Sequence, residues 1–117
     1  MISNEHRFHG RNSLRVVYQN GRTSRSQHFA LKAMANPRRS SYRVAVVVSR
    51  KVEKSAVSRN RMRRRLYAAV RELSPGFNAP HDIVITVLSA QLADTGSAQL
   101  HTELVKSLAA AGVTTGR

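Results

Sequence analysis

The sequence predicts a two-layer α+β fold in which helices pack on one small sheet, and three observations support this prediction. Three segments carry apolar residues at helical spacing, three others have the composition of strands, and the two kinds of segment interleave along the chain. The 117 residues are 41% hydrophobic, which suffices for one domain with one aliphatic core. We therefore treat residues 1–117 as a single domain, with residues 1–5 and 114–117 expected to be disordered.

The first predicted element is a helix over residues 13–20. Leu14, Val17 and Tyr18 stand at i, i+3 and i+4, and Gly21 can end the helix. Residues 22–27 are polar, and no strand is predicted there. Residues 28–34 alternate apolar and other side chains, as in a strand with one buried face.

Residues 36–41 contain Pro37 and read as a turn. The following segment, 42–49, is rich in Val and nearly all apolar after Arg43, which predicts a central strand covered on both faces. Because one short turn joins the two strands 28–34 and 42–49, we expect them to pair as an antiparallel hairpin.

The next segment, 55–73, predicts a long helix that ends before Ser74-Pro75-Gly76. Its buried stripe comprises Met62, Leu66, Ala69, Val70 and Leu73. The opposite side comprises Asn60, Arg64, Tyr67 and Arg71, flanked by Arg63 and by Arg61 with Arg65. A buried strand over 82–88 and an amphipathic helix over 97–111 complete the order αββαβα.

Charge is concentrated in the first two thirds of the chain. The formal net charge is +14, and residues 6–71 hold eighteen Lys and Arg with Glu53 as their single acid. Because the bases are mixed with apolar segments, we expect a charged face on a folded domain rather than a disordered arm. A polyanion, by default a nucleic acid, is the partner that such a charge favours.

The cluster from Arg59 to Arg65 has the chemistry of a phosphate-binding surface. A charge run on a helix is often only a solvated face. Here, however, the bases of the helix are all Arg, whose guanidinium group binds phosphate oxygens in pairs, and Glu partners at i±4 are missing from the first three turns. Asn60 could contact a sugar hydroxyl or a base edge, or simply belong to the helix start.

Other function classes lack their parts. The chain has no Cys, its five His show no paired helical spacing for a metal ion, and its six Gly form no phosphate-binding loop. We expect no intrinsic active site and no metal bound by the protein. The longest apolar run is too short to cross a bilayer, and the N-terminus lacks the apolar stretch of a signal peptide, so we expect a soluble, cytoplasmic protein.

The order of these motifs resembles the bacterial ribonuclease P protein component. Ser49-Arg50-Lys51 followed by Arg59-Asn60-Arg61-Met62-Arg63-Arg64 is similar to that family's strand and Arg-Asn helix signature. Leu14 to Gly21 is similar to its first helix, Phe29-Ala30-Leu31 to the opening of its next strand, and Asp82 to Ile85 to its strand before the last helix.

This resemblance implies an αβββαβα sandwich with a left-handed βαβ crossover, one strand more than the residues alone predict. It implies a non-catalytic, monomeric protein subunit that binds a catalytic RNA and precursor tRNA and assists removal of the 5′ leader, with Mg²⁺ bound mainly by RNA. The residues implied to bind the catalytic RNA are Arg50, Lys51, Arg59, Asn60, Arg61, Arg63 and Arg64. A cleft for the leader is implied at Leu14, Tyr18, Phe29 and Lys32.

In this sequence Leu14 and Lys32 replace aromatic residues that the family often has in that cleft, so leader binding would depend more on charge. Arg65 and Tyr67 also depart from the signature.

Three other functions remain open from the sequence. A ribosomal or general structured-RNA-binding protein would share the charge and the fold. A helix-turn-helix DNA-binding protein would need a short helix and a tight turn before the basic helix. A membrane-surface peptide would need a large aromatic apolar face.

Overall fold

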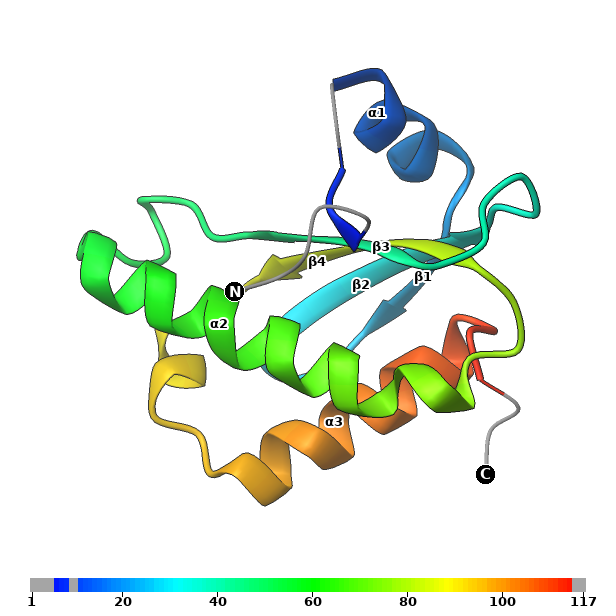
Figure 1. Ribbon diagram of the computed structural model, residues 1–117. Coiled ribbons are helices and arrows are strands. Elements are labelled where there is room, and N and C mark those ends of the chain that lie inside the picture. Colours follow the sequence, from blue (N-terminus) through cyan, green and yellow to red (C-terminus); the bar gives the residue numbers. More distant parts are fainter. Residues whose placement is uncertain (1–5, 9–10, 115–117) are drawn as a thin grey trace.

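The computed structural model describes residues 6–8 and 11–114, which form one four-stranded sheet and three α-helices (Figure 1). The elements are α1 (Arg11–Asn20), β1 (Arg22–Arg25), β2 (Phe29–Ala35), β3 (Arg43–Val47), α2 (Ala56–Leu73), β4 (His81–Val87) and α3 (Ser97–Ala110). Two 3-10 turns, η2 (Ser74–Gly76) and η3 (Ala90–Ala93), follow α2 and β4. The mixed α+β fold predicted from the sequence is confirmed.

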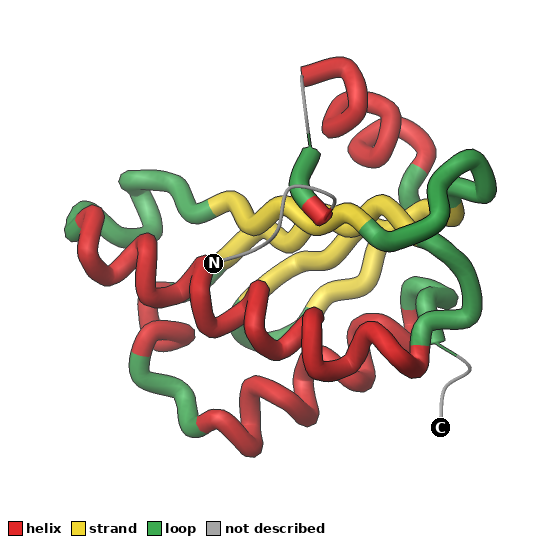
Figure 2. The backbone as a smooth tube through the Cα atoms, viewed as in Figure 1, coloured by secondary structure: helices red, strands yellow, loops and turns green. Residues whose placement is uncertain are grey.

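The strand order is β1-β2-β4-β3, and Figure 2 shows the strands lying side by side in one sheet. β4 pairs with β2 antiparallel and with β3 parallel, so it lies between them. The prediction that β2 and β3 form a hairpin is therefore wrong. The two strands run in opposite directions, but they are not hydrogen-bonded neighbours. Nearly all residues of β4 are buried, as expected for an inner strand covered on both faces, whereas β3 buries only alternate residues. β3 is thus an edge strand and not the central strand that its Val content predicted.

The two faces of the sheet have different partners. α2 and α3 cover one face, and α1 lies against the other (Figures 1 and 2). The main core lies under α2 and α3, and its largest fully buried members are Phe29, Leu31, Val44, Met62, Leu66, Val70, Ile83, Ile85, Leu92, Leu104 and Leu108. On the opposite face, Val17 of α1 and Val84 of β4 are buried. We call this second surface the α1 face.

The sequence analysis missed strand β1. Its residues, Arg22–Arg25, are polar, and only Ser24 is even partly buried. β1 forms because its backbone pairs with β2 from Arg22 opposite Ala33 to Arg25 opposite Ala30. A polar edge strand of this kind has no apolar alternation for a pattern to detect. With β1 included, the order becomes αβββαβα; the hand of the β3–α2–β4 crossover stays a prediction.

Gly21 makes the tight connection from α1 to β1. Its N–H donates to the Val17 carbonyl at 2.7 Å, and a Cβ at this position would lie 2.5 Å from that same oxygen. Only a residue without a side chain fits such an approach. Gly21 therefore fixes where α1 lies relative to the sheet.

Helix α2 begins and ends close to the predicted limits. The Ser55 hydroxyl accepts a hydrogen bond from the Ser58 N–H, which caps the first turn. At the other end, both the N–H and the hydroxyl of Ser74 donate to the Arg71 carbonyl. Met62, Leu66, Ala69 and Val70 face the core as predicted.

Of the predicted disordered ends, residues 1–5 and 115–117 lie outside the described residues, whereas Thr114 is described and partly buried.

Candidate nucleic-acid interface

The loop between β3 and α2 exposes two of the cations predicted to bind RNA. Arg50 and Lys51 are both exposed. The N–H groups of Val52 and Glu53 donate to the Ser49 carbonyl, which turns the chain tightly just after the strand. The strand end therefore holds both cations beside the first turn of α2.

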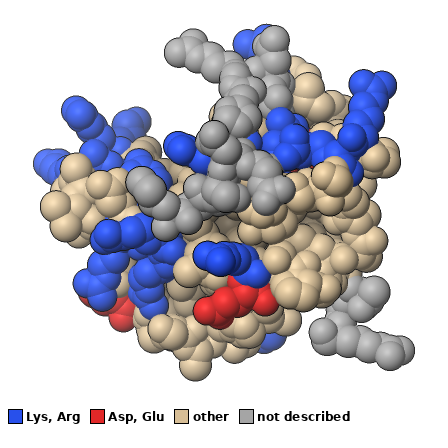
Figure 3. Space-filling model, in the orientation of Figure 1, with Lys and Arg blue, Asp and Glu red and all other residues tan. Residues whose placement is uncertain are grey.

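The solvent side of α2 continues this cationic surface. Asn60, Arg61 and Arg64 are exposed and Arg63 is partly buried. Among the described residues, no carboxylate lies within ion-pair distance of any arginine of α2. Figure 3 shows the Lys and Arg side chains gathered over the β3–α2 loop and the start of α2, with the few acidic groups lower on the molecule. We call Arg50, Lys51, Asn60, Arg61, Arg63 and Arg64 the cationic surface.

Within the cationic surface, Asn60 and Arg63 are joined. The Arg63 guanidinium donates to Asn60 Oδ1 at 2.7 Å. This bond occupies the amide oxygen, so the exposed Asn60 side chain presents its N–H₂ group as a donor for an outside acceptor. The pair therefore holds the Arg63 side chain in place before any ligand arrives.

Arg59, which the resemblance also assigned to RNA, makes hydrogen bonds within the protein. Its guanidinium donates to the carbonyls of Glu53 and Lys54 at 2.9 and 2.8 Å and is partly buried. These bonds tie the β3–α2 loop to the helix. Arg59 thus shapes the cationic surface, and part of its hydrogen-bonding capacity is already used.

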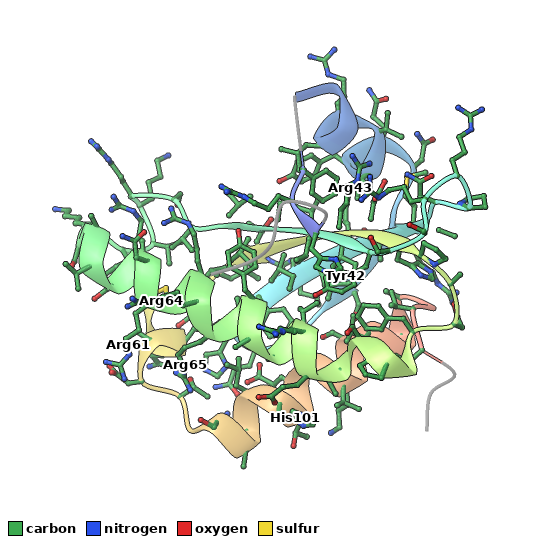
Figure 4. The ribbon with its side chains drawn as sticks, viewed as in Figure 1. Tyr42, Arg43, Arg61, Arg64, Arg65 and His101 are labelled. Atoms are coloured by element: carbon green, nitrogen blue, oxygen red, sulfur yellow. The ribbon has the colours of Figure 1, made fainter. Side chains whose placement is uncertain are left out.

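Arg65 and Tyr67 both turn toward the protein. Arg65 donates to the carbonyls of Leu92, Ala93 and Thr95, in and just after η3. Figure 4 shows Arg65 pointing from α2 toward this segment. Tyr67, predicted on the solvent side, instead packs against the core, with its hydroxyl 3.4 Å from the Val46 nitrogen. That prediction is wrong because the buried stripe of α2 is wider than the five aliphatic residues that defined it.

On the α1 face, two of the residues predicted for the leader cleft lie together. Lys32 Nζ donates to the Tyr18 carbonyl at 2.6 Å and lies 5.8 Å from the centre of the Tyr18 ring. Tyr18 is 42% exposed, and Val47 of β3 is 37% exposed. Leu14, also on α1, is partly buried. This face therefore offers an aromatic ring and a cation beside a sparsely covered part of the sheet.

Phe29 is the fourth residue predicted for that cleft, and the structure corrects this prediction. Its side chain has no exposed surface and belongs to the core beneath α2 and α3. Successive residues of a strand point to opposite faces, so Phe29 and Lys32, three positions apart, cannot share one. This alternation along the strand could have been read from the sequence.

A buried ion pair on the α1 face was not predicted as a contact. Arg43 donates from Nε to Asp82 Oδ1 at 2.9 Å and from a terminal nitrogen to Oδ2 at 2.7 Å, and Asn36 adds a third bond to Oδ2 at 2.9 Å. The Phe8 ring lies 4.7 Å from the centre of the Arg43 guanidinium. Figure 4 shows Arg43 on the α1 side of the sheet.

The charges of this pair depend on each other. Burial disfavours the Asp82 carboxylate, but the hydrogen bonds from Arg43 and Asn36 and the positive charge nearby outweigh it, so the pKa of Asp82 lies below its ordinary value. The hydrogen bond to Asp82 in turn raises the pKa of Arg43. Asp82 is an acidic residue near the start of the apolar strand β4, and this position in the sequence could have indicated such a pair.

Three further observations on the described residues bear on the predicted functions. No group of three or more His, Asp or Glu side chains that could hold a metal ion occurs in the described part of the chain. Across residues 6–8 and 11–114, no helix has the length and apolar character needed to span a bilayer. β3 directly precedes the loop before α2, so α2 has no preceding helix of a helix-turn-helix unit.

The fold and the surface together define a class: a small α/β sandwich with an arginine-faced helix on one side of its sheet and a lysine–tyrosine pair on the other. Comparison with known proteins narrows this class. The sequence model of the Ribonuclease P family matches residues 2–112. The chain therefore belongs to the ribonuclease P protein family.

Individual relatives of the chain support the same family. The chain is 36% identical over 87 residues to the ribonuclease P protein component of a Pseudanabaena species, covering 74% of this chain and 75% of the relative. It is 34% identical over 115 residues to that of Synechococcus elongatus, covering 96% and 94%.

Among solved structures, the Staphylococcus aureus RNase P protein superposes with a TM-score of 0.80 at 20% identity, covering 93% of this chain and 97% of the other. The Thermotoga maritima protein gives 0.74 at 18% identity, covering 86% and 92%. These two likenesses concern the fold.

Proposed function

We propose that the chain acts as the protein subunit of ribonuclease P, binds its catalytic RNA through the cationic surface, and assists removal of the 5′ leader from precursor tRNA. The observation that carries the proposal is the set of arginines on α2 that have no carboxylate partner among the described residues. Their mutual repulsion is relieved when phosphates lie between them. In the free protein, none of the described acidic groups does this.

The second part of the proposal concerns the α1 face. Tyr18 and Lys32 place a stacking ring and a cation side by side, which suits an unpaired RNA strand such as a leader. Because the sheet separates this face from α2, a leader and the catalytic RNA could be bound at the same time. Leu14 lies on the same helix as Tyr18 and would border this strand.

The chemistry of cleavage is assigned to the RNA, with Mg²⁺ held mainly by RNA groups. The protein contributes positive charge, which lowers the amount of Mg²⁺ that the assembled RNAs require. Binding should weaken steeply with salt, because each phosphate contact releases condensed counterions. The protein is proposed to act as a monomer in the cytoplasm.

Leader release tests the proposal directly. Precursor tRNA is incubated with the cognate catalytic RNA at a low and a high Mg²⁺ concentration, with and without the protein. We expect no cleavage by the protein alone and a protein-dependent gain at the lower Mg²⁺ concentration. Equal rates with and without protein at that concentration would refute the function.

A double variant locates the RNA surface. Arg61→Ala with Arg64→Ala removes two exposed guanidinium groups, so we expect affinity for the catalytic RNA to fall about 10- to 100-fold and the slope of log affinity against log salt to decrease by about 2. The thermal midpoint should stay nearly unchanged, since both side chains are exposed. Lys106→Ala, on the exposed side of α3, is the control and should change neither the affinity for the catalytic RNA nor its salt dependence.

A general structured-RNA-binding protein, such as a ribosomal protein, is the alternative. Recovery of the protein from its host with ribosomal subunits, and without the catalytic RNA or precursor tRNA, would favour that alternative.

A further inference from the structure

A cavity at the far end of α2 is not used by the proposed function. It has a volume of about 580 Å³ and lies between the last turn of α2, the start of β3 and the segment that leads into β4. Its lining includes His6, Ser41, Tyr42, Arg71, Phe77 and Asn78. Pockets for small organic ligands have volumes in this range.

Aromatic rings form one wall of the cavity. The His6 ring stacks on Tyr42 with 4.0 Å between ring centres and 10° between planes, while Phe77 meets Tyr42 edge-on at 5.5 Å and 78°. Tyr42 is buried and Phe77 is partly buried, so both rings are held by the core. A flat heteroaromatic ring such as a nucleobase has the shape to pack against such a wall.

The polar groups of the cavity distinguish a nucleotide from a simple anion. Arg71 is exposed, and none of the described residues that line the cavity is an Asp or a Glu. Ser74, another lining residue, caps the carbonyl end of α2, which by itself disfavours an anion, so a phosphate here needs the positive charge of Arg71 in the same last turn. Hydroxyl and amide groups, including Ser41 and Asn78, suit the edge of a base instead. A phosphate is therefore best placed at Arg71, with the base inside.

The position of the cavity also favours RNA. Arg59 and Arg71 are twelve positions apart on α2, which corresponds to about 18 Å along the helix axis. The cationic surface occupies the first half of α2 and its preceding loop, and the cavity lies at the other end. An RNA that binds along the helix would reach both.

We propose that this cavity binds one unpaired nucleotide of RNA, with the base against the His6–Tyr42–Phe77 wall and the phosphate at Arg71. The inference rests on the proposed function, in that RNA is the partner. It adds a second contact point, which would fix the direction of the RNA along α2. A phosphate alone would not use the aromatic wall.

Titration of the isolated full chain tests the cavity. The ¹⁵N-labelled protein is titrated at one fixed ionic strength with each of the four nucleoside 5′-monophosphates and, separately, with inorganic phosphate. We expect at least one nucleotide to shift the amide signals of Ser41, Phe77 and Asn78 with saturation in the millimolar range, and phosphate to leave them in place. No saturable shift with any nucleotide, or equal shifts with phosphate, would overturn the inference.

Variants identify the phosphate contact. Arg71→Gln should weaken nucleotide binding about tenfold, since it removes a charge-assisted hydrogen bond. Lys106→Gln, an equal loss of charge on α3, should leave it unchanged. An unchanged affinity in Arg71→Gln, or an equal loss in both variants, would contradict the placement of the phosphate. Because these titrations contain no catalytic RNA, their failure is distinguishable from failure of the leader-release assay.

Discussion

Replacement of Asp82 by Asn should destabilise the protein, because it neutralises one half of a buried ion pair. The side chains of Asp82 and Arg43 are 5% and 12% exposed, and two hydrogen bonds join them. Removing one partner of such a pair costs about 3 to 5 kcal/mol of unfolding free energy. Arg43 retains some exposure and the Phe8 ring, so we expect the lower limit, about 3 kcal/mol.

The pH dependence gives this prediction a second readout. The pKa of Asp82 is lowered by folding, so its contribution is complete above the pKa of the unfolded chain, about 3.9, and is lost as the pH falls through the lower folded value. The difference in stability between wild type and Asp82→Asn should therefore be constant near neutral pH and shrink once the pH falls below about 4.

Chemical denaturation at a series of pH values, in moderate salt, measures both effects. Asp94→Asn removes an exposed carboxylate and is the control, with an expected change within about 0.5 kcal/mol. A loss below about 1 kcal/mol for Asp82→Asn at neutral pH would refute the reasoning, because the variant would then behave as a surface substitution. A difference that persists undiminished in acid would refute the assignment to ionised Asp82.

Two further substitutions test contacts that hold the helices in place. Arg65→Lys keeps the positive charge but loses the planar guanidinium group, which donates to three carbonyls in and after η3. We expect the free energy of unfolding, measured by urea titration, to fall by about 1 to 3 kcal/mol. An unchanged value would show that these three hydrogen bonds contribute nothing to stability. Gly21→Ala puts a methyl group 2.5 Å from the Val17 carbonyl, so the thermal midpoint measured by circular dichroism should drop by several degrees, whereas an equal or higher midpoint would mean that α1 shifts freely.

The helices were predictable because their signals are local. The apolar stripe of α2 recurs at helical spacing within one segment, and Ser55 and the Ser-Pro-Gly sequence mark its two ends. The three long helices and three of the four strands were therefore predicted within two residues at each end. β1 is the exception, because its polar residues are held by pairing and not by burial.

Sheet order was not predictable in the same way. Whether β2 pairs with β3 or with β4 depends on which strand buries both faces in the assembled sheet, and β4 follows β3 by a complete helix. A short turn around Pro37 favours a hairpin locally, but it does not exclude insertion of a later strand. The Val content of β3 indicates a strand without indicating its neighbours.

For the candidate site, the concentration of positive charge on α2 was predictable. Which of its arginines make contacts within the protein was not. The sequence placed Arg59 to Arg65 on one helix, but which of these arginines remain available depends on distant backbone. Arg65 finds its carbonyl partners 27 to 30 positions away, and Arg59 finds its own in the preceding loop. Such contacts leave no periodic signal. They engage Arg59 and Arg65 within the protein, whereas Arg61 and Arg64 remain exposed.

The asymmetry of the core accounts for the two proposed binding surfaces. Because α2 and α3 both pack on one face of the sheet, nearly all large apolar side chains of the strands point there, and among the described residues the buried apolar contact on the α1 face is the small one at Val17 and Val84. Extending that second core would bury Tyr18 and Val47. Since the fold leaves them exposed, an unpaired strand could lie on the α1 face while the arginines of α2 bind phosphates on the other side of the sheet. Neither ligand would displace the other.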